Sequence, residues 1–400
     1  MSSPNKKKNV LDRMPPEFRD QYFSLYAAPE PEALYPSLYQ KVIDNGTDQI
    51  LKRLKQYNEQ RKELAKTVRS QIQVSQIERD ETLANARVVA SIAGNNGVDL
   101  RSAFAPLYAS TAIVVEGRKI VDNPICTVGE PALWSDEFRP QDRESLLTSK
   151  VQFEVTNEAI AKWNPKYVLI DGTLPLNYGL LPLSTSTEGY SKDFDLTLAN
   201  AIRMLYACYK NNIPIIGFVK RTQRTSLCQS FGTSQIRDTA LLDLILRRGQ
   251  CTTAESSPMR GLVVDSYKKK AEEMHIPRED IPRITNFYSA YARTGLAIPF
   301  RLELPEFCLD QINTLITILY TTSEEDGLPF AIQEADHLTR ITSNLSNIRT
   351  LTLYSKALDL VEDGEMEVED LNLLTLQHSE QWRIREDRSY ASTVLSKEEA

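Results

Sequence analysis

The feature that most constrains the fold is a series of short, apolar segments that alternate with longer segments of helical pattern. The apolar segments cover residues 87–92, 107–115, 167–170 and 213–219. A strand with apolar side chains on both faces must be covered on both faces. Helical patterns over residues 143–163 and 194–210 separate the later strands. The alternation predicts an α/β fold in which helices flank a central sheet.

A long amphipathic helix is expected before this core, over residues 46–85. Its apolar residues recur at spacings of three, four or seven, namely Ile50, Leu54, Tyr57, Leu64, Val68 and Ile72. Such a stripe fits pairing with another helix, in this chain or another, and equally packing within its own domain. The expected organisation is an irregular arm over 1–45, this helix, a core over 86–345, a helical extension over 346–380 and a polar tail over 381–400.

Charge and cysteine usage narrow the function. The net charge of −7 gives no global attraction to nucleic acid, so any DNA contact needs a local basic cluster. Five scattered cysteines without a CxxC pair, with three histidines, argue against a structural zinc site and indicate reduced thiols in the cytoplasm. We expect no secretory signal and no membrane span. No P-loop or GxGxxG pattern supports a bound nucleotide cofactor.

Two acids are candidates for chemistry. Asp171 directly follows the apolar run 167–170, and functional groups gather at the carboxyl ends of strands in α/β sheets. An aspartate before a glycine is also typical of a turn or helix cap. Glu154 lies on the preceding helix. Its side chain is either exposed to solvent or, because the chain runs back along the sheet, close to the end of the strand that carries Asp171. Two converging carboxylates would bind Mn²⁺ or Mg²⁺, which neutralises a phosphate and activates water.

A basic segment follows the strand over 213–219. Lys220, Arg221 and Arg224 leave the end of this strand together with hydroxyl side chains. Lysine and arginine in such a place can pair with phosphate oxygens of DNA, although an ordinary solvated loop has the same composition.

Five short blocks, in this order, resemble the NurA nuclease family over roughly residues 85–345. The blocks lie at 88–94, Glu154, 168–174, 215–221 and 298–337. The resemblance implies a ribonuclease H-like mixed sheet flanked by helices, a homodimer, and Mn²⁺- or Mg²⁺-dependent degradation of DNA. It also implies a HerA-like hexameric ATPase as partner, in DNA end processing for repair or in defence against foreign DNA.

The resemblance assigns roles to three residues. Asp171 falls on the family's second metal-binding aspartate, Glu154 on its helical glutamate, and Lys220 on the lysine after the central strand. Ala93 stands where the family has a further aspartate, a principal metal ligand, and alanine cannot ligate a metal. The chain is then either a natural pseudo-nuclease or an engineered Asp→Ala variant. The other acidic residues of the family pattern are present, which favours the engineered variant. Asp99, six residues later, is a poor substitute.

The last block also departs from the family pattern. Leu328 and Asp336 stand where the family often has a tyrosine and a histidine, and His337 is adjacent. Asp336 could serve as a metal ligand in place of the histidine. Neighbouring helical residues point about 100° apart, so only one of Asp336 and His337 is expected to enter the site.

Three hypotheses therefore remain for the function. The leading one is a metal-dependent DNA nuclease subunit, inactive in this form because of Ala93. Its rival is a non-catalytic DNA-clamping or scaffold subunit of the same motor complex. The third is an unrelated α/β binding protein in which the acidic residues only cap helices or turns. Restoring an aspartate at position 93 would separate the first two.

Overall fold

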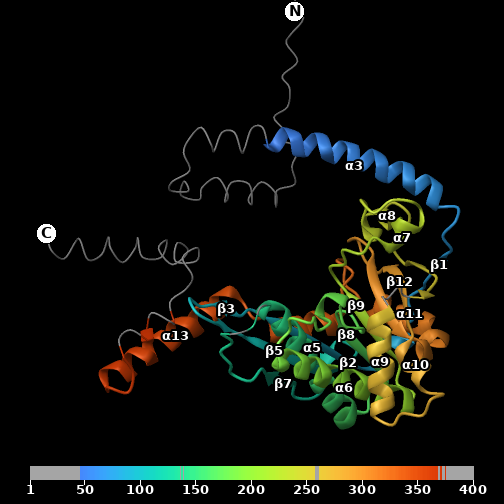
Figure 1. Ribbon diagram of the computed structural model, residues 1–400. Helices are drawn as coiled ribbons and strands as arrows, with labels where there is room; N and C mark the ends of the chain where they lie inside the picture. Colours follow the sequence, from blue (N-terminus) through green and yellow to red (C-terminus); the bar gives the residue numbers. More distant parts are fainter. Residues whose placement is uncertain are drawn as a thin grey trace, which may run out of the picture. The chain divides into compact units, whose positions relative to one another are not determined.

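The computed structural model describes residues 46–135, 137, 139–256, 261–367, 370–371 and 374 (Figure 1). The expected arm over 1–45 and the expected tail over 381–400 lie outside these residues. The chain divides into two compact units, Met1–Gln60 and Arg61–Ala400, and the central sheet belongs to the second. Within the described residues no helix combines the length and the apolar character that crossing a membrane requires.

The first described helix is shorter than the sequence pattern predicts. Helix α3 spans Gly46–Val68 instead of 46–85. Strand β1 (Val74–Gln76) follows and pairs antiparallel with β10 (Gln250–Thr252), so its backbone groups are used in a sheet. Helix α4 (Glu81–Ala84) then begins where the Asp80 side chain accepts from the Thr82 backbone N–H. The prediction was wrong beyond Val68 because strand pairing, a tertiary contact, overrides local helical pattern.

A mixed sheet of eleven strands forms the centre of the described chain. Its order is β1-β10-β12-β13-β9-β8-β2-β5-β6, with β11 paired to β12 and β7 to β5. The remaining strands are β2 (Arg87–Asn95), β5 (Tyr108–Glu116), β6 (Lys119–Ile120), β7 (Ile125–Val128), β8 (Tyr167–Asp171), β9 (Ile215–Val219), β11 (Glu255–Ser256), β12 (Phe287–Arg293) and β13 (Phe300–Pro305). Strands β2, β8 and β9 run parallel in the middle, and the flanking pairs are antiparallel. A separate two-stranded sheet contains β3 (Val98–Asp99) and β4 (Phe104–Ala105).

Helices cover both faces of this sheet, as predicted (Figure 1). One face carries α5 (Pro140–Trp163), α6 (Glu188–Lys210) and α9 (Gly261–Glu273), and the other carries α11 (Ile312–Thr322) and α12 (Phe330–Thr339). The shorter or peripheral elements are α7 (Ser226–Ser230), α8 (Asp238–Leu242), α10 (Ile281–Thr285), α13 (Ser343–Glu362), η3 (Tyr178–Leu180) and η4 (Glu306–Gln311). The central strands are almost fully buried, which explains their apolar sequences.

The ends of the main helices follow from local sequence. Helix α5 has Pro140 at its first turn, where the missing N–H costs nothing, and ends at Asn164 with φ of 40°. Helix α6 starts where the Thr187 side chain accepts from the Tyr190 backbone N–H. These local signals determine where each helix starts or stops, and therefore which of its residues lie opposite which strand residues.

Candidate nucleic-acid and metal site at the strand ends

The parallel strands β8 and β9 end at one edge of the sheet, and charged side chains follow there. Asp171 is the last residue of β8 and pairs in register with Phe218 of β9. Lys220 comes two residues after Phe218, so strand alternation places it on the same face as Asp171. Gly172 follows with φ of 120°, a conformation that glycine adopts without strain, and turns the chain away from the sheet.

Three of the predicted residues meet on the α12 face. The Lys220 Nζ lies 3.0 Å from Asp171 Oδ2 and 2.9 Å from Asp336 Oδ1. Asp336 comes from α12, so the cluster joins two strands and a helix. The ammonium of Lys220 thus stands between the two carboxylates, in the position that a metal ion would need.

Burial of Asp171 changes its acidity. The side chain is 14% exposed, and this burial raises the pKa of Asp171 to about 6. Lys220 opposes the rise and Asp336 adds to it. The cause is that a buried carboxylate loses hydration, which the single ammonium only partly replaces.

Glu154 does not join this cluster, contrary to the expected convergence with Asp171. Its Oε1 accepts a hydrogen bond of 2.9 Å from Asn200 Nδ2 on α6 and lies 3.4 Å from Lys150 Nζ. The α5 residue that reaches the strand end is Gln152, whose Nε2 donates to the backbone oxygens of Ser91 (3.1 Å) and Asp171 (3.0 Å). Residues two apart on a helix point about 200° apart, so Gln152 and Glu154 cannot both face the sheet.

Gln152 was not predicted as a site residue, because the direction of its side chain depends on how α5 is rotated about its axis against the sheet. The sequence did contain one indication that Gln152 is buried: it stands between Val151 and Phe153, two apolar residues of the same helix. A buried amide there needs hydrogen-bond partners, and free strand carbonyls supply them.

Ala93 lies near Asp171 along the sheet but not on its face. Ser91 pairs with Ile170, which brings Ile92 beside Asp171 and Ala93 beside Gly172. Ser91 faces α5, because its hydroxyl is 2.7 Å from Thr156 Oγ1. Alternation then turns Ala93 toward α5 as well. The sequence expectation that position 93 belongs beside Asp171 therefore does not agree with this register.

The predicted phosphate-binding residues are divided between the two faces. Lys220 belongs to the α12 face. Arg221 and Arg224 line a cavity on the α9 face, together with Arg301 and Glu303 of β13. Arg301 and Glu303 were not among the predicted site residues, although two charged residues within the otherwise apolar run 298–304 could have indicated them.

The donor set does not fit a divalent ion held by three protein ligands. Among the described ranges no group of three or more His, Cys, Asp or Glu side chains is placed to hold an ion. Asp171 and Asp336 both pair with the single ammonium of Lys220, and Asp99 instead contacts Gln141 at 3.2 Å. His337 is exposed and lies 4.0 Å from Glu334. In this structure the cluster is an ion-paired group of two carboxylates and one ammonium.

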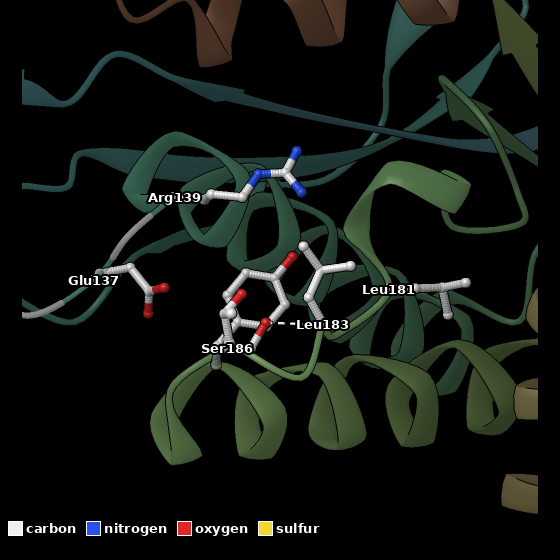
Figure 2. A pocket seen from close by; sticks show the side chains of 7 residues that line it. Glu137, Arg139, Leu181, Leu183 and Ser186 are labelled. Carbon is white, nitrogen blue, oxygen red and sulfur yellow. Dashed lines mark hydrogen bonds between the residues drawn. The ribbon is translucent and has the colours of Figure 1, made fainter.

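Another pocket lies between the start of α6 and the segment before α5. Figure 2 shows Glu137, Arg139, Leu181, Leu183 and Ser186 around it, with Ser186 Oγ accepting from the Leu183 backbone N–H. Its volume of about 10 Å³ accommodates at most a water molecule. We assign it no functional role.

The chain is similar to one known protein family and to several solved structures. The sequence profile of the NurA domain matches residues 87–341. The crystal structure of the NurA nuclease from Sulfolobus solfataricus is 15% identical, with a TM-score of 0.57 over 82% of this chain and 99% of that chain. A NurA structure bound to dAMP and manganese is 10% identical, with a TM-score of 0.49 over 76% and 94%. Endonuclease V from Bacillus subtilis is 14% identical, with a TM-score of 0.33 over 73% and 91%. No curated protein matches the sequence.

Proposed function

The chain belongs to the NurA domain family, whose profile matches more than half of it, and we propose that it is a DNA-holding subunit of a NurA-type nuclease assembly that does not itself cut in this form. The observation that carries this proposal is the position of the Lys220 ammonium between Asp171 and Asp336. An ammonium there places a cation at the strand ends and fills the space between the two carboxylates.

The surrounding residues support the absence of cutting. Ala93 offers no ligand, and Glu154 is hydrogen-bonded to Asn200. An ion that entered between Asp171 and Asp336 would have to displace Lys220, and it would then find two protein carboxylates instead of three ligands. Hard cations need several oxygen ligands, so binding would be weak.

Local basic residues support DNA contact despite the net charge of −7. Lys220, Arg221 and Arg224 leave one strand end toward both faces of the sheet, where a DNA backbone crossing this edge would meet them. Contacts of this kind neutralise phosphates and release counterions, so affinity falls steeply with salt. They position DNA without reading its sequence.

Family membership suggests the assembly. We propose that two copies form a homodimer and that a HerA-like hexameric ATPase delivers DNA to it, for end processing or for degradation of foreign DNA. On the dimer the net charge doubles, which makes the local basic residues at the strand ends more important for admitting DNA.

A second candidate function is a metal-dependent DNA nuclease. The short distances from one Nζ to Asp171 and Asp336 favour it, because two carboxylates that share one cation can also share another. Under this candidate Mn²⁺ or Mg²⁺ takes the place of the ammonium between Asp171 and Asp336. The register turns position 93 toward α5, so an aspartate there would not complete this site.

The experiment combines DNA retention with cutting. The full chain and its Ala93→Asp, Lys220→Ala and Lys192→Ala variants are mixed with end-labelled single- and double-stranded DNA, with and without Mn²⁺ or Mg²⁺. We expect retention without cutting, weaker retention for Lys220→Ala, and no effect of Lys192→Ala, since Lys192 is an exposed residue of α6 outside the Asp171–Lys220–Asp336 cluster. We also expect Ala93→Asp to remain inactive because residue 93 faces α5.

Three outcomes would change the assignment. Metal-dependent cutting by the unaltered chain or by Ala93→Asp would establish the nuclease candidate instead. Equal retention by the Lys220→Ala and Lys192→Ala variants would remove Lys220 from the DNA contact. No retention by any variant at low salt would reject the DNA-holding function.

A further inference from the structure

A cavity of about 660 Å³ opens on the α9 face, beside the strand ends. Its walls come from the turn after β8, the end of β9, strand β13 and helix α9. Ligand pockets for small molecules typically have volumes of about 300–1,000 Å³. The cavity is thus large enough for a nucleotide and much larger than a single phosphate needs.

The cavity is separate from the Asp171–Lys220–Asp336 cluster. Arg301 and Glu303 pair in register with Val219 and Gly217, so these residues share one face of the sheet. Phe218 lies between them and shares the opposite face with Asp171. The two sites therefore lie back to back across the same strand end.

Positive charge dominates the cavity wall. The guanidinium groups of Arg221, Arg224 and Arg301 all line it, against the single carboxylate of Glu303. Arg301 Nη2 lies 3.0 Å and Arg224 Nη1 3.9 Å from Glu303 Oε1. The other oxygen, Oε2, accepts from the Leu174 backbone N–H at 3.2 Å. Glu303 thus compensates about one of the three cations.

The nearby acid Asp238 adds a second negative charge that acts on Arg224, so two acids stand against the three guanidinium groups. Its carboxylate accepts hydrogen bonds from the backbone N–H groups of Leu227 and Cys228 and from the Tyr291 hydroxyl, at 3.2, 3.0 and 2.8 Å. These donors stabilise its charge in place. Burial lowers the pKa of Arg224 and the neighbouring Arg301 adds to this, whereas Glu303, Tyr291 and Asp238 oppose it.

Arg301 supplies independent evidence for a ligand. Its side chain is 8% exposed, and its Nε is buried without a hydrogen-bond partner among the residues that the structure describes. Buried guanidinium N–H groups are almost always paired, because an unpaired one has lost its hydration without replacement. A phosphate in the cavity would supply the acceptor oxygens, and the planar fork of arginine matches phosphate geometry.

The rest of the wall fits the remainder of a nucleotide. Thr173 and Thr222 offer hydroxyls near the arginines, and Leu176 and Val263 offer apolar surface. Tyr178 lines the cavity and is 40% exposed, so its aromatic side chain forms part of the wall that a base would meet. Stacking on an aromatic ring tolerates every base, because each base has a π-face.

We propose that this cavity binds a nucleoside monophosphate unit, either free or as the phosphate-bearing terminal nucleotide of a DNA strand. Arg301 and Arg221 bind the phosphate, and Tyr178 stacks on the base. The DNA source rests on the proposed DNA-holding function, whereas binding of a free nucleotide does not. The chemistry is recognition only, without any covalent step.

The test is calorimetric titration of the full chain with thymidine 5′-monophosphate, thymidine and inorganic phosphate. Arg301→Lys keeps the charge beside Glu303 and loses the planar guanidinium fork, and Arg221→Gln removes the charge of an exposed residue. We expect at least tenfold weaker binding of the monophosphate to both variants, and unchanged binding to Arg278→Gln, an exposed arginine elsewhere. Circular dichroism on each variant verifies folding.

A second titration identifies the source. Oligonucleotides with a 5′- or 3′-terminal phosphate are compared with the same strands ending in hydroxyls. Tighter binding of a phosphorylated strand, lost in Arg301→Lys, supports the strand end. Equal binding of all strands with retained monophosphate binding supports the free nucleotide, and leaves DNA holding by Lys220 intact. Monophosphate binding no tighter than thymidine binding, or unaltered in both Arg301→Lys and Arg221→Gln, overturns the proposal.

Discussion

Replacement of Asp171 by asparagine tests the electrostatics of the strand end directly. Burial raises the pKa of Asp171 from 3.8 to about 6 in the folded protein, despite the ion pair with Lys220. A difference of one pH unit corresponds to about 1.4 kcal/mol, so ionised Asp171 lowers the free energy of unfolding by up to about 3 kcal/mol. Asparagine has nearly the same shape and no charge. We therefore expect Asp171→Asn to be more stable at pH 7.5, by about 1–3 kcal/mol.

The pH dependence gives the sign of the effect. The folded protein holds the Asp171 proton more tightly than the unfolded chain does, so stability falls as the pH rises from about 4 to about 6. Above that window the loss is complete, and below it Asp171 is protonated in both states. The advantage of Asp171→Asn should therefore shrink steadily between pH 6 and pH 4.

Urea unfolding at pH 7.5, 6, 5 and 4, followed by circular dichroism, measures this difference. Each variant is compared with the unaltered chain at the same pH, so other titrating groups cancel. Asp310→Asn, at an exposed aspartate of η4, is the matched control and should change the stability by less than about 0.5 kcal/mol. A destabilised Asp171→Asn at pH 7.5, or a difference that does not vary with pH, would refute the reasoning and make the Lys220 pair a net stabilising contact.

Further predictions concern other parts of the molecule. Gln152→Leu should lower the free energy of unfolding by about 2–4 kcal/mol, measured by urea titration, because two buried strand carbonyls lose their donor; an unchanged midpoint would contradict this. Glu154→Gln should change stability by less than about 1 kcal/mol, since the amide oxygen can still accept from Asn200, and a larger loss would assign Glu154 a role that its contacts do not show. Light scattering at micromolar concentration should give the mass of a dimer, and a monomer there would exclude the proposed homodimer. DNA retention should fall with salt with a smaller logarithmic slope in Lys220→Ala, by about one unit, and an equal slope would mean that Lys220 touches no phosphate.

The sequence determined the central elements of the fold. Strands β8 and β9 are apolar on both faces, and an apolar run of that length between helical patterns has few other solutions. Helices α5 and α6 were expected, and their ends at Trp163 and Lys210 agree with the expected ends at 163 and 210. Both helices start earlier than expected, at Pro140 and Glu188 instead of at 143 and 194. The place of Asp171 at a strand end followed from the same local pattern.

Only the tertiary structure decided which side chains meet. Asp336 joins Asp171 through Lys220, while Glu154 points toward α6 and Arg301 meets Glu303 on the other face. The side of a strand changes with every residue, and a helix turns by about 100° per residue. A sequence pattern predicts strand register and helix rotation only to within a residue or two. A shift of one residue along a strand is enough to move a side chain to the opposite face of the sheet. The register of the parallel strands and the rotation of α5 and α12 therefore had to be supplied by the packing of the whole core.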